Sequence, residues 1–234
     1  MLYTLESTRA NIRNREGKRV FYLGEGDRLT AAAREYLVGE GIEILPASQA
    51  KPDDYQLLSG GTCREKPEHM THLHGNVLVP KTHPRIAFRG AMDTLEAELL
   101  LCQQAADPIL RQELGQLLDF ARMLLRNEVL GEKVSEGKLC GLDEKQLREH
   151  SHRPQDFYGQ PHFMPAVTDG ACILQLNRAR CAARAAELQA VHAFTDREGN
   201  PTREDILQAM NRLSSMLYIL MIREKAKSPG NASI

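Results

Sequence analysis

The sequence predicts a mainly α-helical protein, in which a helical bundle carries a small β-α-β extension at its N-terminus. Two observations lead to this fold class. From Arg85 onward, apolar residues recur at alternating steps of three and four over several long segments, which is the spacing of one helix face. Before that point, two strand-like runs, RVFYL and IEIL, flank one helix-forming segment. The 234 residues suffice for one sizeable core and a small additional unit.

Composition and charge exclude several classes of protein. Lys and Arg number 30 against 31 Asp and Glu, and this near-neutral balance argues against a general binder of nucleic acid or membrane surfaces. No apolar run approaches the roughly 20 residues of a membrane span, and the N-terminus lacks the apolar core of a secretory signal. The five cysteines are scattered without CxxC spacing. We therefore expect a reduced, cytoplasmic protein without nucleic-acid or membrane partners.

Residues 1–48 are expected to form the small β-α-β unit. RVFYL and IEIL are its strands, and AAAREYLVGEG is its helix, with Thr30 as the N-cap. The segment GEGD lacks the full glycine pattern of a dinucleotide-binding loop, so we expect a scaffolding or docking role.

Residues 49–84 are expected to be a linker followed by a nucleotide-binding loop. The stretch 62–84 is dense in His, Thr, Gly and Lys, and it is expected to be irregular. Its three closely spaced histidines, His69, His72 and His74, could hold a metal. The competing hypothesis is a phosphate-contacting loop that combines backbone N–H groups with Thr71, Gly75, Asn76 and Lys81.

Residues 85–226 are expected to be the helical bundle. One apolar stripe marks the first helix: Phe88, Met92, Leu95, Leu99, Cys102 and Ala106. Asp107-Pro108 should begin a second helix that stops near Gly131, and a short helix should begin at Asp143. The segment 151–167 contains three prolines and is expected to be a loop. Its apolar side chains are typical of a loop that covers a ligand.

Two further helices carry polar residues in lines. On the helix expected from Asp169 to Phe194, Arg180, Arg184 and Glu187 share one face at i, i+4 and i+7. The motif NPTRED should form a capping box at the start of the last helix, 205–223. That helix carries one polar strip opposite its apolar stripe: Gln208, Asn211, Arg212 and Ser215.

Charged residues recur where a bundle would favour apolar ones. The groups are Lys81 with Arg85, Asp93 with Glu96, Arg180 and Arg184 with Glu187, and Asn211 with Arg212. Arginines in lines, balanced by a few carboxylates, make a cradle for a polyphosphate and could help seat Mg²⁺. The alternative is a network of structural ion pairs that holds helices or subunits in register.

The chain carries three motifs in register: KTHPRIAFRGAMDTLEAEL, RCAARAAE and NRLSS. Together they resemble the ATP:corrinoid adenosyltransferases, whose fold is a helical bundle. KTHPRIAFRGAMDTLEAEL is similar to the family segment that opens the first long helix. RCAARAAE (180–187) is similar to an Arg-x-x-x-Arg-x-x-Glu line, and NRLSS (211–215) to an Asn-Arg-Leu-Ser-Asp signature. KPEHMTHL, SHRP, DILQAMNRLSS and RLTAAAREYLVGEGIEI resemble the ethanolamine-utilization branch.

Two departures from the family pattern matter. Ser215 replaces the Asp of the signature, so the role of that carboxylate cannot be carried over. Some ethanolamine-type members bind a divalent metal through a His and a cysteine cluster, whereas this chain has only Cys63 there. We therefore expect no metal site and no metal other than the Mg²⁺ that accompanies ATP.

The resemblance implies transfer of the 5′-deoxyadenosyl group of ATP to the cobalt of reduced cobalamin, with release of triphosphate. It implies roles for three catalytic residues: Arg184, Arg212 and Phe163. Phe163 would be part of an apolar wedge under the corrin, although it could instead simply pack its loop. The implied contacts to nucleotide and phosphate come from Thr71, His72, Gly75, Asn76, Lys81, Arg180, Glu187 and Asn211.

The resemblance also implies an assembly and partners. Members form homotrimers with sites between subunits, and Arg180 would pair with Asp93 across a subunit boundary. Ethanolamine ammonia-lyase, its microcompartment and a reductase are candidate partners. Two rival hypotheses remain: a corrinoid-binding accessory protein without transferase activity, and a protein that docks on a microcompartment shell and binds no nucleotide.

Overall fold

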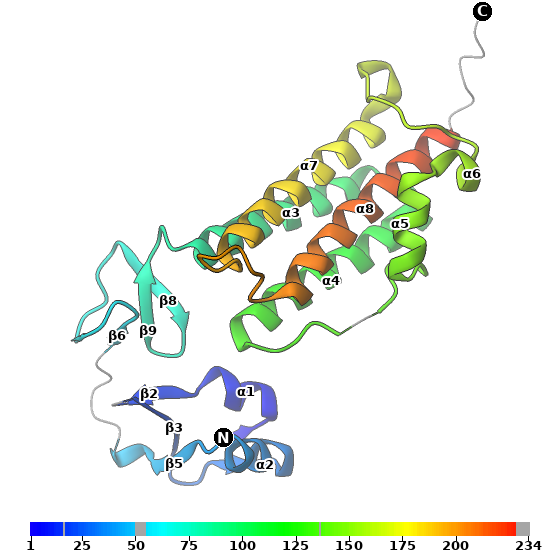
Figure 1. Cartoon of the computed structure of the whole chain (residues 1–234). Helices are drawn as coiled ribbons and strands as arrows, with labels where there is room; N and C mark the ends of the chain where they lie inside the picture. Colours follow the sequence, from blue (N-terminus) through cyan, green and yellow to red (C-terminus); the bar gives the residue numbers. More distant parts are fainter. Residues whose placement is uncertain (16, 50–54, 136, 228–234) are drawn as a thin grey trace, which may run out of the picture. The chain divides into compact units, whose positions relative to one another are not determined.

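The computed structural model describes residues 1–15, 17–49, 55–135 and 137–227 (Figure 1). The chain divides into two compact units, Met1–His83 and Pro84–Ile234. No described helix is long and apolar enough to cross a membrane.

The first part of the N-terminal unit is the expected β-α-β fragment with additions. Strands β3 (Lys18–Leu23) and β5 (Glu43–Pro46) pair in parallel and are joined through helix α2 (Ala31–Gly39). The Thr30 hydroxyl accepts the Ala33 backbone N–H, as the predicted N-cap requires. The further elements are β1 (Leu2–Tyr3), α1 (Leu5–Ala10), β2 (Arg13–Arg15), β4 (Arg28–Leu29) and the 3-10 turn Ala47–Gln49.

The segment 62–84, which we expected to be irregular, contains three β-strands, so this expectation was wrong for 62–63, 70–74 and 77–80. Strands β6 (Tyr55–Leu57), β7 (Thr62–Cys63), β8 (Met70–His74) and β9 (Val77–Pro80) form one sheet in the order β7-β6-β9-β8. The sheet forms because β9 buries Val77, Leu78 and Val79 completely or nearly so. Residues 50–54 of the expected linker lie outside the described residues.

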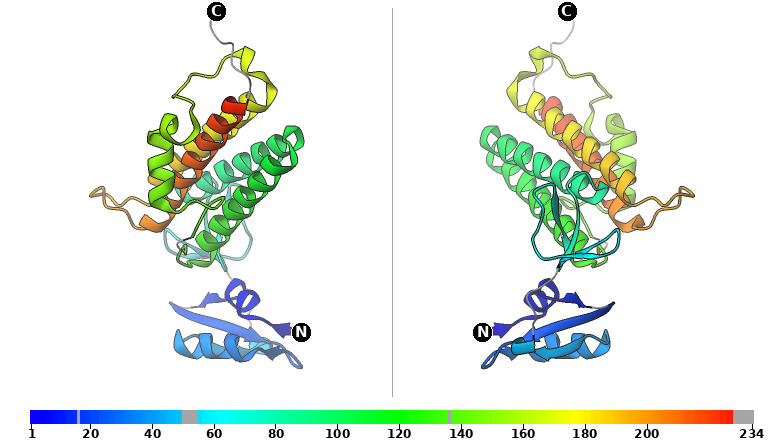
Figure 2. Two further views of the ribbon diagram at one scale, coloured as in Figure 1. Left: turned by 90° about the vertical axis from the view of Figure 1, so that its right-hand side faces the viewer. Right: turned by 90° about the vertical axis from the view of Figure 1, so that its left-hand side faces the viewer.

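In the described part of the second unit, four long helices form the bundle. They are α3 (Pro84–Ala105), α4 (Pro108–Leu130), α7 (Gly170–Ala193) and α8 (Glu204–Lys227). Helix α3 packs on α4 and α7, and α8 packs on α4 and α7, so the apolar faces meet in one core (Figures 1 and 2). The predicted stripes of all four helices are buried there, which confirms the mainly α fold class.

The shorter helices correct one expectation. Helix α5 (Glu144–His152) begins with a capping box at Asp143, as predicted. Helix α6 (Pro154–Tyr158), however, lies within the expected loop 151–167. Pro154 stands at the first position of that helix, where its missing N–H costs nothing, so the prolines did not exclude a helix. The irregular part is 159–166, followed by the 3-10 turn Val167–Asp169.

The last helix starts differently from the prediction. Thr202 donates its hydroxyl to the Phe194 carbonyl, and the Asp205 carboxylate accepts the Val134 N–H and pairs with Arg203. The capping box expected at the start of α8 is therefore not formed, because tertiary contacts engage both of its polar residues.

Candidate functional site

A cavity of about 400 Å³ lies where the polar lines of α7 and α8 meet the end of α5, and we call it the small cavity. Its lining residues are Ser151, Arg180, Arg184, Glu187, Asn211, Ser214, Ser215 and Tyr218. Four predicted binding or catalytic residues are thus brought together: Arg180, Arg184, Glu187 and Asn211. On each helix the spacing i, i+4, i+7 points side chains to one side, while small alanines on α7 let α8 approach closely.

Hydrogen bonds order part of this cavity. The Asn211 side-chain amide donates to the Glu187 carboxylate over 2.9 Å, which joins α8 to α7. The Arg180 guanidinium donates to the Asn177 side chain over 2.9 Å and lies 5.9 Å from the Tyr218 ring centroid. The described residues show no contact between Arg180 and Asp93, which is exposed on α3. The predicted pairing of these two residues across a subunit boundary therefore stays a prediction.

Arg184 differs from its neighbours because its charge is uncompensated. Its side chain is exposed and lines the cavity, and no described residue forms a hydrogen bond or ion pair with it. Together with Arg180, it makes this part of the surface cationic. Such an arrangement can accept an anion without first breaking an internal ion pair.

Arg212 lies at a second, larger space, of about 1130 Å³, which we call the large cavity. Its Nη2 pairs with the Glu144 carboxylate at 2.7 Å, and its Nη1 donates to Asn211 over 3.3 Å. Its Nε is buried and has no hydrogen-bond partner among the described residues. Hydrogen bonds from Arg212 and Gln208 lower the pKa of Glu144. Arg212 and Arg184, both predicted to be catalytic, thus line different cavities in this structure.

Phe163, in the irregular segment 159–166, is not among the residues that line the small cavity, but its backbone contacts Tyr218, which does line it. Its ring is half-buried against the core, and the Lys225 ammonium lies 5.6 Å from the ring centroid. Burial raises the pKa of the Tyr218 hydroxyl, while Arg180 and a hydrogen bond from the Phe163 backbone act in the opposite direction. Phe163 and the small cavity therefore share Tyr218 as a neighbour.

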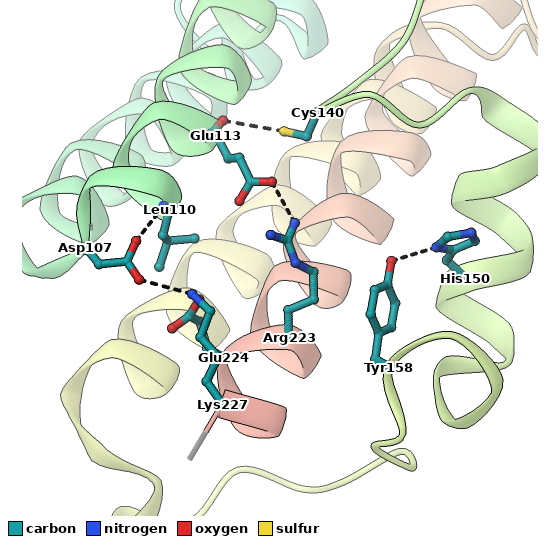
Figure 3. A network of polar contacts seen from close by, with 9 residues as sticks. All are labelled: Asp107, Leu110, Glu113, Cys140, His150, Tyr158, Arg223, Glu224 and Lys227. Atoms are coloured by element: carbon teal, nitrogen blue, oxygen red, sulfur yellow. Dashed lines mark hydrogen bonds and ion pairs between the residues drawn. The ribbon is translucent and has the colours of Figure 1, made fainter. Parts of the chain in front are cut away.

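A separate polar network fixes the C-terminal half of α8 (Figure 3). Arg223 donates to Glu113 of α4 over 2.6 Å, and Lys227 pairs with Asp107, the N-cap of α4, at 3.0 Å. His150 of α5 and Tyr158 of α6 pair through Nδ1 and the hydroxyl at 2.6 Å. These contacts join α8 to α4 and α5 to α6.

The predicted nucleotide-binding residues of the N-terminal unit lie on or near the β8–β9 hairpin. Asn76 is buried, and its side chain exchanges two hydrogen bonds of 3.0 Å with the Asn14 backbone. Gly75 has a φ of +51°, and an added Cβ would lie 2.6 Å from the Ile12 carbonyl oxygen. Both residues therefore shape the hairpin, whatever else they bind.

The other predicted residues of this unit are more accessible. Thr71 is half-buried opposite Val79, and Lys81 is exposed just after β9. His72 is exposed and meets the Tyr55 ring edge-on at 5.5 Å. Among the described residues, no group of three or more His, Cys, Asp or Glu side chains is placed to hold a metal.

The sequence analysis did not predict four residues that line the small cavity: Ser151, Ser214, Ser215 and Tyr218. Of these, Ser215 was placed in the polar strip of the last helix but was not predicted to be a site residue. A signal for two of them was present, because Asn211, Ser215 and Tyr218 repeat on α8 the i, i+4, i+7 spacing of the α7 line. Ser151 carried no such signal, since it comes from a separate helix.

Comparison with known proteins gives consistent results. A family model described as cobalamin adenosyltransferase matches residues 62–224. The chain is 32% identical to the corrinoid adenosyltransferase EutT of Salmonella typhimurium, covering 94% of this chain and 91% of that protein. It is 30% identical to the EutT of Escherichia coli K12 over the same shares. A variant PduO-type ATP:corrinoid adenosyltransferase from Lactobacillus reuteri, solved with cobalamin and ATP, is 21% identical. The match covers 62% of this chain and 82% of that one, with a TM-score of 0.45. With most of its length matched by the family model and nearly all of it by relatives at 30% identity or more, the chain belongs to the cobalamin adenosyltransferase family.

Proposed function

We propose that this protein transfers the 5′-deoxyadenosyl group of ATP to the cobalt of reduced cobalamin. Family membership supports the reaction, and the uncompensated Arg184 in the small cavity is the observation that carries the assignment of the site. In this reaction the electron pair of Co(I) forms a bond to C5′ of the ribose. The bond from C5′ to the phosphate oxygen breaks, and triphosphate leaves with the electron pair of this broken bond.

The protein's task in this reaction is to position groups and to stabilise charge. Cob(I)alamin is a very strong nucleophile, so the protein need not supply a base. It must hold C5′ in line with cobalt and stabilise the leaving triphosphate. Arg184, and Arg212 once Glu144 releases it, would bind the anion, while Asn211 and Glu187 would orient the nucleotide.

The side chains that line the small cavity could contact a Mg²⁺ ion that binds together with ATP. Mg²⁺ in nucleotide sites is held by one or two carboxylates together with phosphates and water. Of the described residues that line this cavity, Glu187 alone carries a carboxylate. Glu187 would therefore be the protein contact of an ion bound mainly to the phosphates, and that ion would neutralise part of the triphosphate charge.

Phe163 would serve the corrinoid half of the reaction. Co(II) is reduced more easily when its lower axial ligand is removed, and an apolar side chain under the corrin would favour that state. Asp93 would pair with Arg180 of another subunit in a homotrimer, completing the site. Thr71, His72, Gly75, Asn76 and Lys81 stay predicted nucleotide contacts, and ethanolamine ammonia-lyase is the proposed user of the product.

An anaerobic assay tests this function. Protein, ATP, Mg²⁺ and chemically reduced cobalamin should yield the cobalt–carbon bond, seen by absorbance, and one triphosphate for each bond formed. ATP binding at equilibrium should weaken in Lys81→Ala. Corrinoid binding without transfer or ATP binding would instead identify an accessory protein, and the absence of both kinds of binding would favour a docking role.

A further inference from the structure

His162 and Phe163 both join the segment 159–166 to α8, and His162 does so through a side-chain hydrogen bond. Its Nδ1 and the Tyr218 hydroxyl lie 2.6 Å apart, and the two rings stack at 5.7 Å with an interplanar angle of 16°. Its Nε2 lies 3.1 Å from the His152 carbonyl oxygen at the end of α5. His162 thus joins its own segment to both α5 and α8.

The chemistry of these atoms fixes the direction of the hydrogen bonds. A carbonyl oxygen can only accept, so Nε2 of His162 carries the proton. In the neutral ring Nδ1 is then the acceptor, and the Tyr218 hydroxyl donates to it. The Tyr218 oxygen remains able to accept the hydrogen bond from the Phe163 backbone. Two consecutive residues of the segment are therefore bound to one hydroxyl.

Tyr218 is also part of the small cavity, which it lines below the Arg180 guanidinium. The Tyr218 side chain thus borders the proposed nucleotide site, while its hydroxyl holds the segment that carries Phe163. The neighbouring Met164 is 89% exposed, so it supplies little burial to keep the segment in place. The hydroxyl contacts therefore order the segment together with the packing of the half-buried Phe163 ring.

We propose that Tyr218 and His162 form a clip that positions Phe163 relative to the small cavity, so that both are positioning residues for the corrinoid. This inference rests on the proposed adenosyltransferase function. The clip holds the His162 side chain and the Phe163 backbone, which limits where the Phe163 ring can lie. A loosened clip would therefore impair corrinoid use more than ATP use.

The test compares Tyr218→Phe and His162→Gln with the control Tyr158→Phe. Tyr158 makes an equivalent 2.6 Å contact to a histidine, but it does not line the small cavity (Figure 3). Tyr218→Phe keeps the aromatic ring and removes only the hydroxyl. His162→Gln changes the other partner of the same hydrogen bond. Because both variants must give the same result, an unrelated local defect in one of them cannot decide the outcome.

The first measurement needs no activity. Hydrogen exchange of peptides covering 159–166 should become about tenfold faster in both clip variants, because the loss of one hydrogen bond makes local opening of the segment easier. The exchange rate should stay unchanged in Tyr158→Phe. The second measurement is kinetic. We expect kcat/KM for the corrinoid to fall about tenfold, while KM for ATP changes less than about twofold. The electron paramagnetic resonance signal of bound Co(II) cobalamin with ATP should show less of the form without a lower axial ligand.

The outcomes separate the two proposals. Unchanged exchange in both variants would overturn the clip, and faster exchange with unchanged corrinoid kinetics would overturn its positioning role. Equal losses for ATP and corrinoid would also overturn that role, because they would indicate general damage to the fold. A wild-type protein that performs no transfer would overturn the proposed function, while faster exchange in the variants would still support the clip itself.

Discussion

The carboxylate of Asp205 is expected to make a large, pH-dependent contribution to stability. It lies at the rim of the large cavity, where it accepts the Val134 N–H over 2.8 Å and pairs with Arg203 at 2.9 Å. Its side chain is only 12% exposed. Burial acts to raise the pKa of Asp205, but the hydrogen bonds from Arg203 and Val134 outweigh it and lower the pKa from 3.8 to about 2.

That pKa difference gives the size of the effect. One pKa unit corresponds to about 1.4 kcal/mol, so a fall from 3.8 to about 2 corresponds to roughly 2 kcal/mol at neutral pH. Asp205→Asn should therefore lower the free energy of unfolding by about 2 kcal/mol at pH 7. Because the folded pKa lies below the unfolded one, the contribution is complete above about pH 5 and is lost as the pH falls toward 2. Near pH 3 the difference between variant and wild type should be about half as large.

Urea unfolding followed by helical circular dichroism measures this difference, since the long helices all belong to the unit Pro84–Ile234. Asp119→Asn, an exposed carboxylate on α4, is the matched control and should leave the midpoint unchanged. The reasoning is refuted if Asp205→Asn unfolds at the wild-type urea concentration, or if its deficit is equally large at pH 7 and pH 3.

Three further outcomes are expected. Arg184→Ala should slow adenosyl transfer at least ~100-fold, the scale for loss of one preorganised charge contact, whereas the exposed Arg197→Ala should not; near-normal turnover would remove Arg184 from the site. Glu128→Gln should cost about 3 kcal/mol in the same unfolding assay, because two arginines bind this fully buried carboxylate. Gly75→Ala should destabilise the unit Met1–His83 by about 1–3 kcal/mol, seen as faster hydrogen exchange in β8 and β9 but not in α8.

Most of the helical fold could be predicted from local patterns. The apolar stripes predict the four long helices, and residues such as Asp107 and Gly131 mark their ends because caps act over only a few residues. The sheet β6–β9 could not be predicted in this way. Its strands are two to five residues long, and their pairing depends on which residues become buried together, a tertiary property that the sequence pattern of 62–84 does not display.

The small cavity was partly predictable for a related reason. A line at i, i+4, i+7 identifies side chains that share one helix face, so the sequence alone groups Arg180, Arg184 and Glu187. The pattern does not say which helix faces that line. Ser151 reaches the cavity only because α5 packs on α8, and no residue of α5 carries a repeat that predicts this packing.

The separation of Arg212 from Arg184 follows from helix geometry. Neighbouring residues on an α-helix point about 100° apart. Asn211 therefore faces Glu187 on α7, whereas Arg212 faces Glu144 on α5. The signature NRLSS thus serves both cavities: Asn211, Ser214 and Ser215 line the small cavity, and Arg212 lines the large one. An anion that recruits Arg212 to the small cavity must compete with Glu144, whose carboxylate is already paired at 2.7 Å. If Arg212 acts on triphosphate, Glu144 therefore limits how readily it does so, and the state of this ion pair couples α5 to the proposed chemistry.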